Sequence, residues 1–244
     1  MRWVFCYNKT MIKPYTKNAD YSYTAGFYPT FELLKYRFDS LISIYVSEDS
    51  LNTKGYKKLL SIVPEEKIIL STKVFNKLKE KGNDHVIGVF KKFEDELVVE
   101  NSHIVLVNPS DQGNLGNIMR SMLAFGYKDL AIITPGADNF SPKTVRSSMG
   151  SIFAMRIQHF ASFEEYLVKY PRLYYPFMLQ SSKGLMEVGK PEENYALVFG
   201  NEATGLPAEL ENGHAVRIEQ SKDVDSLNLA TAAVVAMYYF KNIQ

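Results

Sequence analysis

The chain has 244 residues, of which 46% are hydrophobic and 23% charged, and its formal net charge at pH 7 is +1. This length accommodates one large domain or two small ones, and the composition is typical of a globular protein rather than of a disordered one. No apolar run approaches the roughly 20 residues that span a bilayer, so we expect no membrane segment.

The residues that usually mark secretion or metal binding are sparse. The N-terminal stretch MRWVFCYNKT lacks the sustained apolar region and small-residue cleavage site of a secretion signal. Cys6 is the single cysteine, so no internal disulfide can form, and we expect a cytoplasmic protein. The histidines have no ligand spacing, so we expect no metal; they are His85, His103, His159 and His214.

Charge is divided unevenly along the chain. Residues 1–92 carry 16 lysines and arginines against 9 acidic residues, a net +7, whereas residues 93–244 carry 12 against 18, a net −6. A basic region beside an acidic remainder indicates that the first region meets a polyanion. A solvated lysine-rich surface explains the same charge, so charge alone leaves both interpretations open.

Strand and helix patterns alternate in the N-terminal part. Strands are predicted at 41–47, 67–71 and 85–90, and helices at 30–38 and 72–82. A charged polar stretch, residues 91–103, then separates two apolar patterns. We therefore predict a small α/β domain over residues 1–95 and a second domain over residues 100–244.

The C-terminal part alternates more regularly. Strands are predicted at 103–108, 130–134, 153–157, 174–179, 195–200 and 214–218, and helices at 115–126, 142–149, 162–170 and 226–242. This alternation predicts a parallel sheet covered on both faces. Ligands of such sheets bind beyond the carboxyl ends of the strands.

The first unusual strand end is NPSDQGNLGNIMRSMLAFG, residues 108–126. We expect Asn114 to cap a helix whose apolar residues fall at helical spacing. Arg120 lies away from that apolar stripe, where it could face a phosphate. An ordinary surface arginine on a capped helix is the open alternative.

The second is LVFGNEATGLP, residues 197–207. An apolar strand ends in Gly200, and a tight loop containing Asn201, Glu202 and Gly205 comes next. Backbone N–H and C=O groups in such a loop can bind the edges of an adenine, although a plain strand-to-helix turn fits as well.

The third is RIEQSKDVDSLNLATAAVVAMYYF, residues 217–240, in which we expect Ser226 and Asn228 to cap a helix. The helix is apolar on nearly all sides, which is typical of a helix in a core or in an interface. Near a chain end, an oligomer interface is the more attractive of the two.

These three segments, in this order, resemble the motifs of the SpoU/TrmH family of RNA methyltransferases in the SPOUT superfamily. That family shows N-x-G-x-x-x-R, then F-G-N-E-x-x-G-L after a strand, then S-L-N before a small-residue helix. The first is present here as Asn114, Gly116 and Arg120, and the others as residues 199–206 and 226–228. The resemblance covers about residues 100–244, and SPKTVRSSMG (141–150) is similar to the family's stretch between its first two motifs.

The resemblance implies an α/β fold in which a parallel sheet carries a C-terminal trefoil knot. SYTAGFYPTFELLK and HVIGVF are similar to the family's small N-terminal substrate-binding domain of ribosomal-protein-like α/β fold. S-adenosylmethionine is the implied cofactor, and RNA, either ribosomal or transfer RNA, is the implied substrate. The N-terminal domain favours ribosomal RNA. A homodimer through the C-terminal knot domain is also implied.

The resemblance also assigns site residues. S-adenosylmethionine would be held by Leu179, Gly200, Gly205, Ile218 and Leu227. Methyl transfer to a ribose 2′-hydroxyl would use Arg120, Asn114, Glu202, Ser226 and Asn228. Lys143 and Arg146 would hold the RNA backbone. Because arginine keeps its proton at neutral pH, we expect Arg120 to bind a phosphate and stabilise the developing alkoxide rather than act as a base.

One departure from the family lies before the last motif, where I-P-M is usual and this chain has Ile218, Glu219 and Gln220. An RNA-binding protein of the same fold without catalytic activity is therefore an alternative. A doubly wound nucleotide-dependent enzyme is a second one, disfavoured because no G-x-G-x-x-G fingerprint is present.

Overall fold

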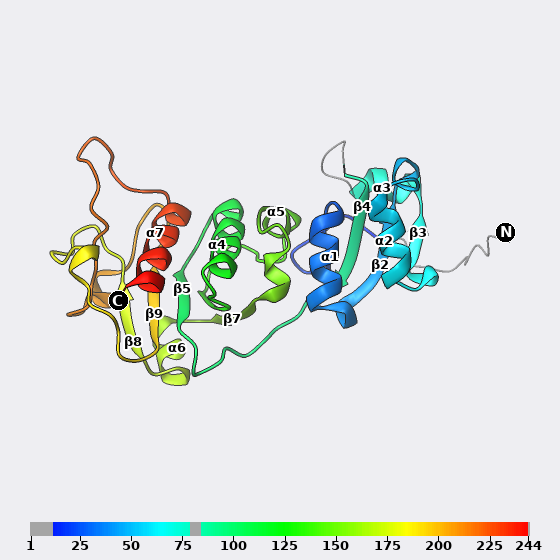
Figure 1. Cartoon of the computed structure of the whole chain (residues 1–244). Helices are drawn as coiled ribbons and strands as arrows, with labels where there is room; N and C mark the ends of the chain where they lie inside the picture. The colour runs from blue at the N-terminus through cyan, green and yellow to red at the C-terminus, as the bar shows by residue number, and fades with distance from the viewer. Residues whose placement is uncertain (1–11, 79–83, 244) are drawn as a thin grey trace. The chain divides into compact units, whose positions relative to one another are not determined.

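Helices and strands alternate along the computed structural model, which describes residues 12–78 and 84–243 (Figure 1). In chain order they are β1 (Tyr21–Tyr23), α1 (Phe27–Tyr36), β2 (Leu41–Val46), α2 (Lys54–Ile62), β3 (Ile68–Leu70), α3 (Thr72–Leu78), β4 (Val86–Lys91), β5 (His103–Val107), α4 (Gln112–Ala124), β6 (Asp129–Ile133), α5 (Pro142–Ser147), β7 (Arg156–Phe160), α6 (Phe163–Lys169), β8 (Leu173–Pro176), β9 (Tyr195–Phe199) and α7 (Leu229–Asn242). Cys6 and the end of the helix predicted at 72–82 lie outside the described residues.

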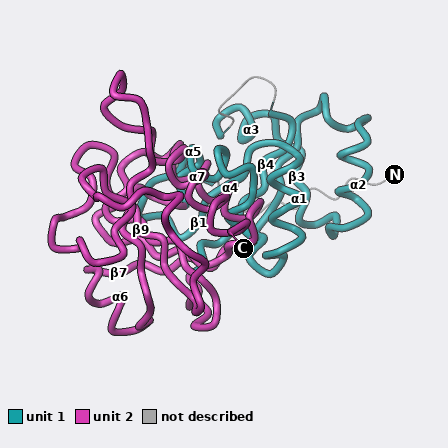
Figure 2. The backbone as a smooth tube through the Cα atoms, turned by 60° about the vertical axis from the view of Figure 1, so that its left-hand side comes forward, with its two compact units in different colours: residues 1–93, 140–153 teal, residues 94–139, 154–244 magenta. Residues whose placement is uncertain are grey.

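The first unit comprises residues 1–93 and 140–153 (Figure 2). Its sheet has the order β1-β4-β2-β3, in which only β2 and β3 run parallel. Gly150 has φ +82°, and a Cβ there would lie 2.8 Å from the Cβ of Glu32 on α1, so a glycine is required for this approach. Arg146 on α5 forms a bidentate ion pair with Asp84, at 2.8 and 3.2 Å. These contacts bind α5 to the first unit, although it comes after β6 in sequence.

The second unit comprises residues 94–139 and 154–244 and contains a five-stranded sheet of order β7-β6-β5-β9-β8. Every neighbouring pair is parallel, which confirms the predicted parallel sheet. Every residue of β5 and β6 is buried, as expected for central strands covered on both faces. Helix α4 packs against α7, and α6 packs against β7 (Figure 1).

Two predicted strands are wrong in position or kind. The strand predicted at 153–157 is β7 at Arg156–Phe160, because Phe153 belongs to a short 3-10 helix and packs in the first unit's core, with its ring 4.9 Å from that of Phe90. The strand predicted at 214–218 is absent from the described chain. Val216 pairs with Phe177 and Arg217 with Gly184, so no continuous ladder forms.

Candidate functional site

Helix α4 begins close to the carboxyl end of β5, and its cap differs from the prediction. The N-cap is Asp111, whose side chain accepts a hydrogen bond from the Asn114 N–H at 2.7 Å. Asn114 is therefore inside the first turn, which frees its side chain for contacts across the site. An aspartate is as good a cap as an asparagine, and it lies three residues earlier in the same turn.

The carboxylate of Glu202, in the loop after β9, joins that loop to the start of α4. One oxygen accepts from the backbone N–H and the hydroxyl of Ser110, at 2.9 and 2.7 Å. The other accepts from the backbone N–H of Asp111 and from Asn114 Nδ2, both at 3.1 Å. Partial burial alone would raise the pKa of Glu202, but the hydrogen bonds from Ser110 and Asn114 outweigh it and lower the pKa to about 2. Glu202 is thus a permanent anion that accepts four hydrogen bonds.

A relay of amide side chains connects α7 to this carboxylate. Asn228 caps α7, because its Oδ1 accepts from the N–H groups of Ala230 and Thr231 at 2.9 and 3.3 Å. Its Nδ2 must therefore be the group that donates to Asn114 Oδ1, at 3.0 Å. Asn114 Nδ2 in turn donates to Glu202. Residues from all three sequence motifs are thereby held within one hydrogen-bonded chain.

The loop after β9 is tightly closed. Asn201 and Gly205 exchange backbone hydrogen bonds of 3.2 and 2.9 Å, and Gly205 has φ +68°. A Cβ at Gly200 would lie 2.2 Å from the backbone carbon of Gly205, so only glycine fits there. The Asn201 side chain fixes the loop to the residue that follows β5 by donating to the Asn108 carbonyl at 2.7 Å.

A pocket of about 330 Å³ opens beside this loop, at the carboxyl ends of β8 and β9. All five predicted cofactor residues line it: Leu179, Gly200, Gly205, Ile218 and Leu227. Glu202 and Ser226 line it as well. Ser226 is exposed and does not cap α7, a correction to the prediction, because Asn228 fills that position.

The segment that departs from the family pattern, residues 218–220, lies partly in the pocket lining and partly outside it. Ile218 and Gln220 line the pocket, and Glu219 does not. The carboxylate of Glu219 lies against Gly184, where it would overlap any added Cβ. Gln220 donates from Nε2 to the Asp225 carbonyl at 3.1 Å and so closes the loop between them. The added negative charge therefore lies outside the pocket lining.

Three of the proposed catalytic residues are not in the pocket lining: Arg120, Asn114 and Asn228. The two asparagines reach it through Glu202. Arg120 is exposed, six residues beyond Asn114 on α4, and within the described chain its guanidinium forms no hydrogen bond or ion pair. Of the residues predicted to bind RNA, Lys143 is exposed, whereas Arg146 is held by Asp84. The structure brings neither of these two into the pocket lining.

Sequence reasoning missed Ser110 and Asp111 as parts of the site, and it placed Asn201 in the second motif without a role. Ser110 and Asp111 stand in an S-D pair before the helix, and this capping signal was available in the sequence. Nothing in the local pattern indicates that Asn201 binds the carbonyl of a residue 93 positions earlier.

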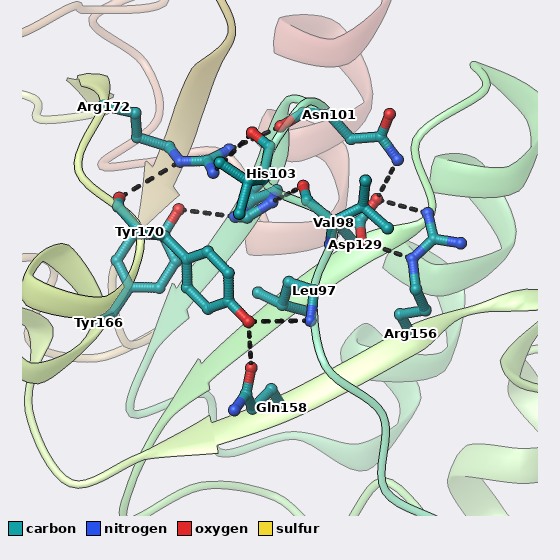
Figure 3. Close-up of polar contacts among 11 residues, drawn as sticks. Leu97, Val98, Asn101, His103, Asp129, Arg156, Gln158, Tyr166, Tyr170 and Arg172 are labelled. Carbon is teal, nitrogen blue, oxygen red and sulfur yellow. Dashed lines mark hydrogen bonds and ion pairs between the residues drawn. The ribbon is translucent and has the colours of Figure 1, made fainter.

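A second polar network lies at the amino ends of the same strands (Figure 3). Asp129 accepts from Arg156, Asn101 and the backbone N–H of Val98. His103 is fully buried, and burial lowers its pKa to about 4. Its Nε2 lies 2.9 Å from the Val98 carbonyl, which can only accept, so the neutral ring carries its proton on Nε2. These contacts fix residues 98–101 to the sheet edge.

Two other kinds of feature are missing from residues 12–78 and 84–243. No helix within these ranges is long and apolar enough to cross a membrane. No group of three or more His, Cys, Asp or Glu side chains in that part of the chain is arranged to hold a metal ion.

Comparisons with known proteins agree with this geometry. The model of the SpoU rRNA Methylase family matches residues 101–238. The chain is 25% identical over 213 residues to the 23S rRNA (guanosine(2553)-2′-O)-methyltransferase RlmP of Bacillus subtilis (strain 168), covering 81% of this chain and 86% of that protein. It is 28% identical over 202 residues to the 23S rRNA (uridine(2479)-2′-O)-methyltransferase of Streptomyces viridochromogenes, covering 76% and 70%. The crystal structure of the SpoU methyltransferase AviRb from Streptomyces viridochromogenes in complex with AdoMet matches with a TM-score of 0.79 at 21% identity, covering 91% and 89%.

Proposed function

The chain belongs to the SpoU rRNA methylase family, whose model covers more than half of it, and from this premise we propose its reaction. The protein transfers a methyl group from S-adenosylmethionine to a ribose 2′-hydroxyl of RNA. The observation that carries the proposal is the convergence of Glu202, Asn114 and Asn228 beside a pocket lined by all five predicted cofactor residues.

The pocket fits the cofactor in size and in backbone shape. Its volume of about 330 Å³ lies in the range of small-molecule sites, roughly 300–1,000 Å³. A Cβ at Gly205 would meet nothing within 4 Å, so that side of the loop is open to a ligand. Leu179, Gly200, Gly205, Ile218 and Leu227 are the residues that would hold the cofactor. When bound, S-adenosylmethionine supplies a methyl group already activated by positively charged sulfur.

The protein's own task is then to align the ribose and stabilise charge. We assign Arg120 to an RNA phosphate and to the alkoxide that develops at the 2′-oxygen, because a guanidinium keeps its protons at neutral pH. Glu202, with a pKa of about 2 and four donors already bound, is a positioning residue and not a proton acceptor. The second amide proton of Asn114 and of Asn228, together with the Ser226 hydroxyl, is available to orient the ribose.

We extend the proposal to a homodimer formed through the C-terminal region. Arg120 is exposed and does not line the pocket of its own chain, so the site is incomplete in one copy. A second copy that supplies Arg120 would complete it. Tyr238 on α7 is 60% exposed and offers apolar area for such a contact.

The finer features of the fold belong to the proposal as well. We propose a trefoil knot within residues 100–244. In support, Phe177 and Gly184 after β8 bridge to Val216 and Arg217, and α7 then returns to pack against α4. We also propose that residues 1–95 form a ribosomal-protein-like domain that binds RNA. The net +7 of residues 1–92 supports this.

Ribosomal RNA is the preferred substrate in this proposal. The 23S rRNA enzymes of Bacillus subtilis and Streptomyces viridochromogenes match 81% and 76% of the chain, well beyond the 101–238 segment that defines the family. A cytoplasmic location is part of the same proposal, supported by the single cysteine.

Two measurements test the proposal. Calorimetric titration with S-adenosylmethionine should give a saturable heat, and its absence would favour an RNA-binding protein without the chemistry. Mapping of 2′-O-methyl positions in total RNA with and without the protein should reveal a new site in ribosomal RNA. A new site in transfer RNA alone would overturn the substrate assignment.

A further inference from the structure

A second cavity, of about 510 Å³, lies at the edge of the sheet opposite the cofactor pocket. Its lining includes Asp129, Arg156 and Tyr195, which are the first residues of β6, β7 and β9. The cofactor pocket, in contrast, is lined by the last residue of β9 and by the loop after that strand. The two cavities are therefore separate sites at opposite ends of the same parallel strands.

Asp129 is the one carboxylate in the lining of this cavity, and its oxygens already accept hydrogen bonds from other residues of the chain. Asp129 is fully buried, and it accepts from Arg156 Nε and Nη2 at 2.6 and 2.7 Å, from Val98 N–H at 2.9 Å and from Asn101 Nδ2 at 2.8 Å (Figure 3). Burial alone would raise the pKa of Asp129, but the hydrogen bonds from Arg156, Val98 and Asn101 lower it. Asp129 therefore stays ionised and cancels the charge of Arg156.

Hydrogen-bond donors in the same lining are left over. The remaining guanidinium nitrogen of Arg156 points away from Asp129 and forms no hydrogen bond among the described residues, although Asp95 interacts electrostatically with this side chain (Figure 3). Lys128 and Lys241 also line the cavity, and within the described chain their ammonium groups form no ion pair. The hydroxyls of Tyr127 and Tyr195 lie 2.7 Å apart, so one proton joins them, and the second hydroxyl proton can be donated to a ligand or to the neighbouring Ser102 side chain. Tyr127 is only 6% exposed, so an unused donor in this pair of hydroxyls would be costly.

The charge balance favours an anion. In the lining, the charges of Arg156 and Asp129 cancel, and the two lysines contribute two positive charges. Outside the lining, Asp95 acts on Arg156 and Arg172 acts on Asp129, which adds one charge of each sign. The carboxyl ends of α4 and α7 reach the cavity through Phe125 and Lys241 and carry about half a negative charge each, which leaves a net charge of about +1. The lining has more donors than acceptors, and its one carboxylate, Asp129, is already fully hydrogen-bonded. A ligand rich in acceptor oxygens would therefore satisfy the remaining donors.

We propose that this cavity binds a phosphate group, held by Lys128, Lys241, Arg156 and a tyrosine hydroxyl. The volume exceeds that of a free phosphate and is suited to a small phosphorylated molecule, with Phe125 as an apolar wall. A phosphodiester of an RNA strand presents the same chemistry. The inference does not depend on methyl transfer.

The test is calorimetric titration of the full chain with three probes: inorganic phosphate, 5′-AMP, and a short RNA without terminal phosphates. The wild-type protein should bind at least one of them. The Lys128→Ala/Lys241→Ala double variant should bind it at least about tenfold more weakly, and Tyr127→Phe should bind it several-fold more weakly. Lys190→Ala, which removes an exposed lysine outside the cavity, should bind as the wild type does.

The probes separate the two sources of phosphate. Binding of phosphate and 5′-AMP without the RNA assigns the cavity to a free small molecule, whereas binding of the RNA that the double variant loses assigns it to a nucleic acid strand. Absence of binding by all three at millimolar concentration overturns the proposal. So does equal weakening by Lys190→Ala, because the affinity is then a general effect of charge. Tyr127→Phe keeps the proposal testable if the double variant fails to fold.

Discussion

Replacement of Glu202 by glutamine removes one charge from the site and changes its shape very little. The carboxylate accepts four hydrogen bonds, two at each oxygen, from Ser110, Asp111 and Asn114. A glutamine has one acceptor oxygen, so its NH₂ group must face one of the two donor pairs. The variant therefore loses two hydrogen bonds, and its NH₂ group faces donor groups that it cannot bind.

The size of the effect depends on the pKa of Glu202, which is about 2 in the folded protein against an ordinary value of 4.5. At 1.36 kcal/mol per pKa unit the full shift corresponds to about 3.4 kcal/mol, and solvent screening of this partly exposed group reduces it to about 1–2 kcal/mol. Two donors without an acceptor add about 1 kcal/mol. We therefore expect Glu202→Gln to lower the free energy of unfolding by about 2–3 kcal/mol at pH 7.

The pH dependence has a definite sign. Because the folded-state pKa is depressed, this contribution is present above about pH 4.5 and is lost as the pH falls towards 2. Urea unfolding of the wild type and of Glu202→Gln, monitored by circular dichroism at pH 7 and pH 3.5, should show a difference that shrinks in acid. Hydrogen exchange should show faster exchange at the Ser110 and Asp111 amides of the variant.

The matched control is Glu193→Gln, which removes an exposed carboxylate outside the pocket and should leave stability within about 0.5 kcal/mol of the wild type. An equal loss of stability at both pH values, or unchanged exchange at Ser110 and Asp111, would refute the reasoning. Glu202 would then not be the anion that holds α4.

Three further changes test the rest of the site. Arg120→Ala should lower methyl transfer by at least about a hundredfold with cofactor affinity nearly unchanged, and full activity would reject its assignment. Mixing it with Gly200→Ala, inactive because an added Cβ meets the Gly205 backbone at 2.2 Å, should restore part of the activity if a partner supplies Arg120. Gly200→Ala by itself should bind S-adenosylmethionine at least about tenfold more weakly by calorimetry; undiminished affinity would remove this loop from the cofactor site. Asn228→Ala should destabilise the protein by about 1 kcal/mol in urea unfolding through loss of the α7 cap, and a larger cofactor effect than stability effect would place Asn228 in binding.

The strand pattern of the second unit was readable from the sequence because each central strand is short, apolar and succeeded by a polar turn. The exact cap of α4 was not, since Asp111 and Asn114 are both good capping residues in one turn. The position of β7 depended on Phe153, an apolar residue that the other unit uses for its own core. Strand β1 went unpredicted because three residues are too few for a periodic signal. Helix α2 was missed although its apolar residues fall at helical spacing, so its signal was present in the sequence.

The candidate site shows the same division between local and distant information. The resemblance to the family implied five cofactor residues, and all five are among the residues that line the pocket. The hydrogen bonds from Asn228 to Asn114 and from Asn114 to Glu202 join residues 114 and 88 positions apart, which no local pattern encodes. No local pattern encodes the ion pair between Arg146 and Asp84 either.

The Glu202 carboxylate links the loop that borders the pocket to the start of α4, the helix that carries Arg120. Coupling between two ligands is reciprocal. If S-adenosylmethionine orders the loop and, through Glu202, the helix, then it raises the affinity for RNA, and bound RNA raises the affinity for S-adenosylmethionine by the same factor. S-adenosylmethionine and RNA would consequently bind cooperatively, and loss of the hydrogen bonds from α4 to Glu202 would make their binding independent.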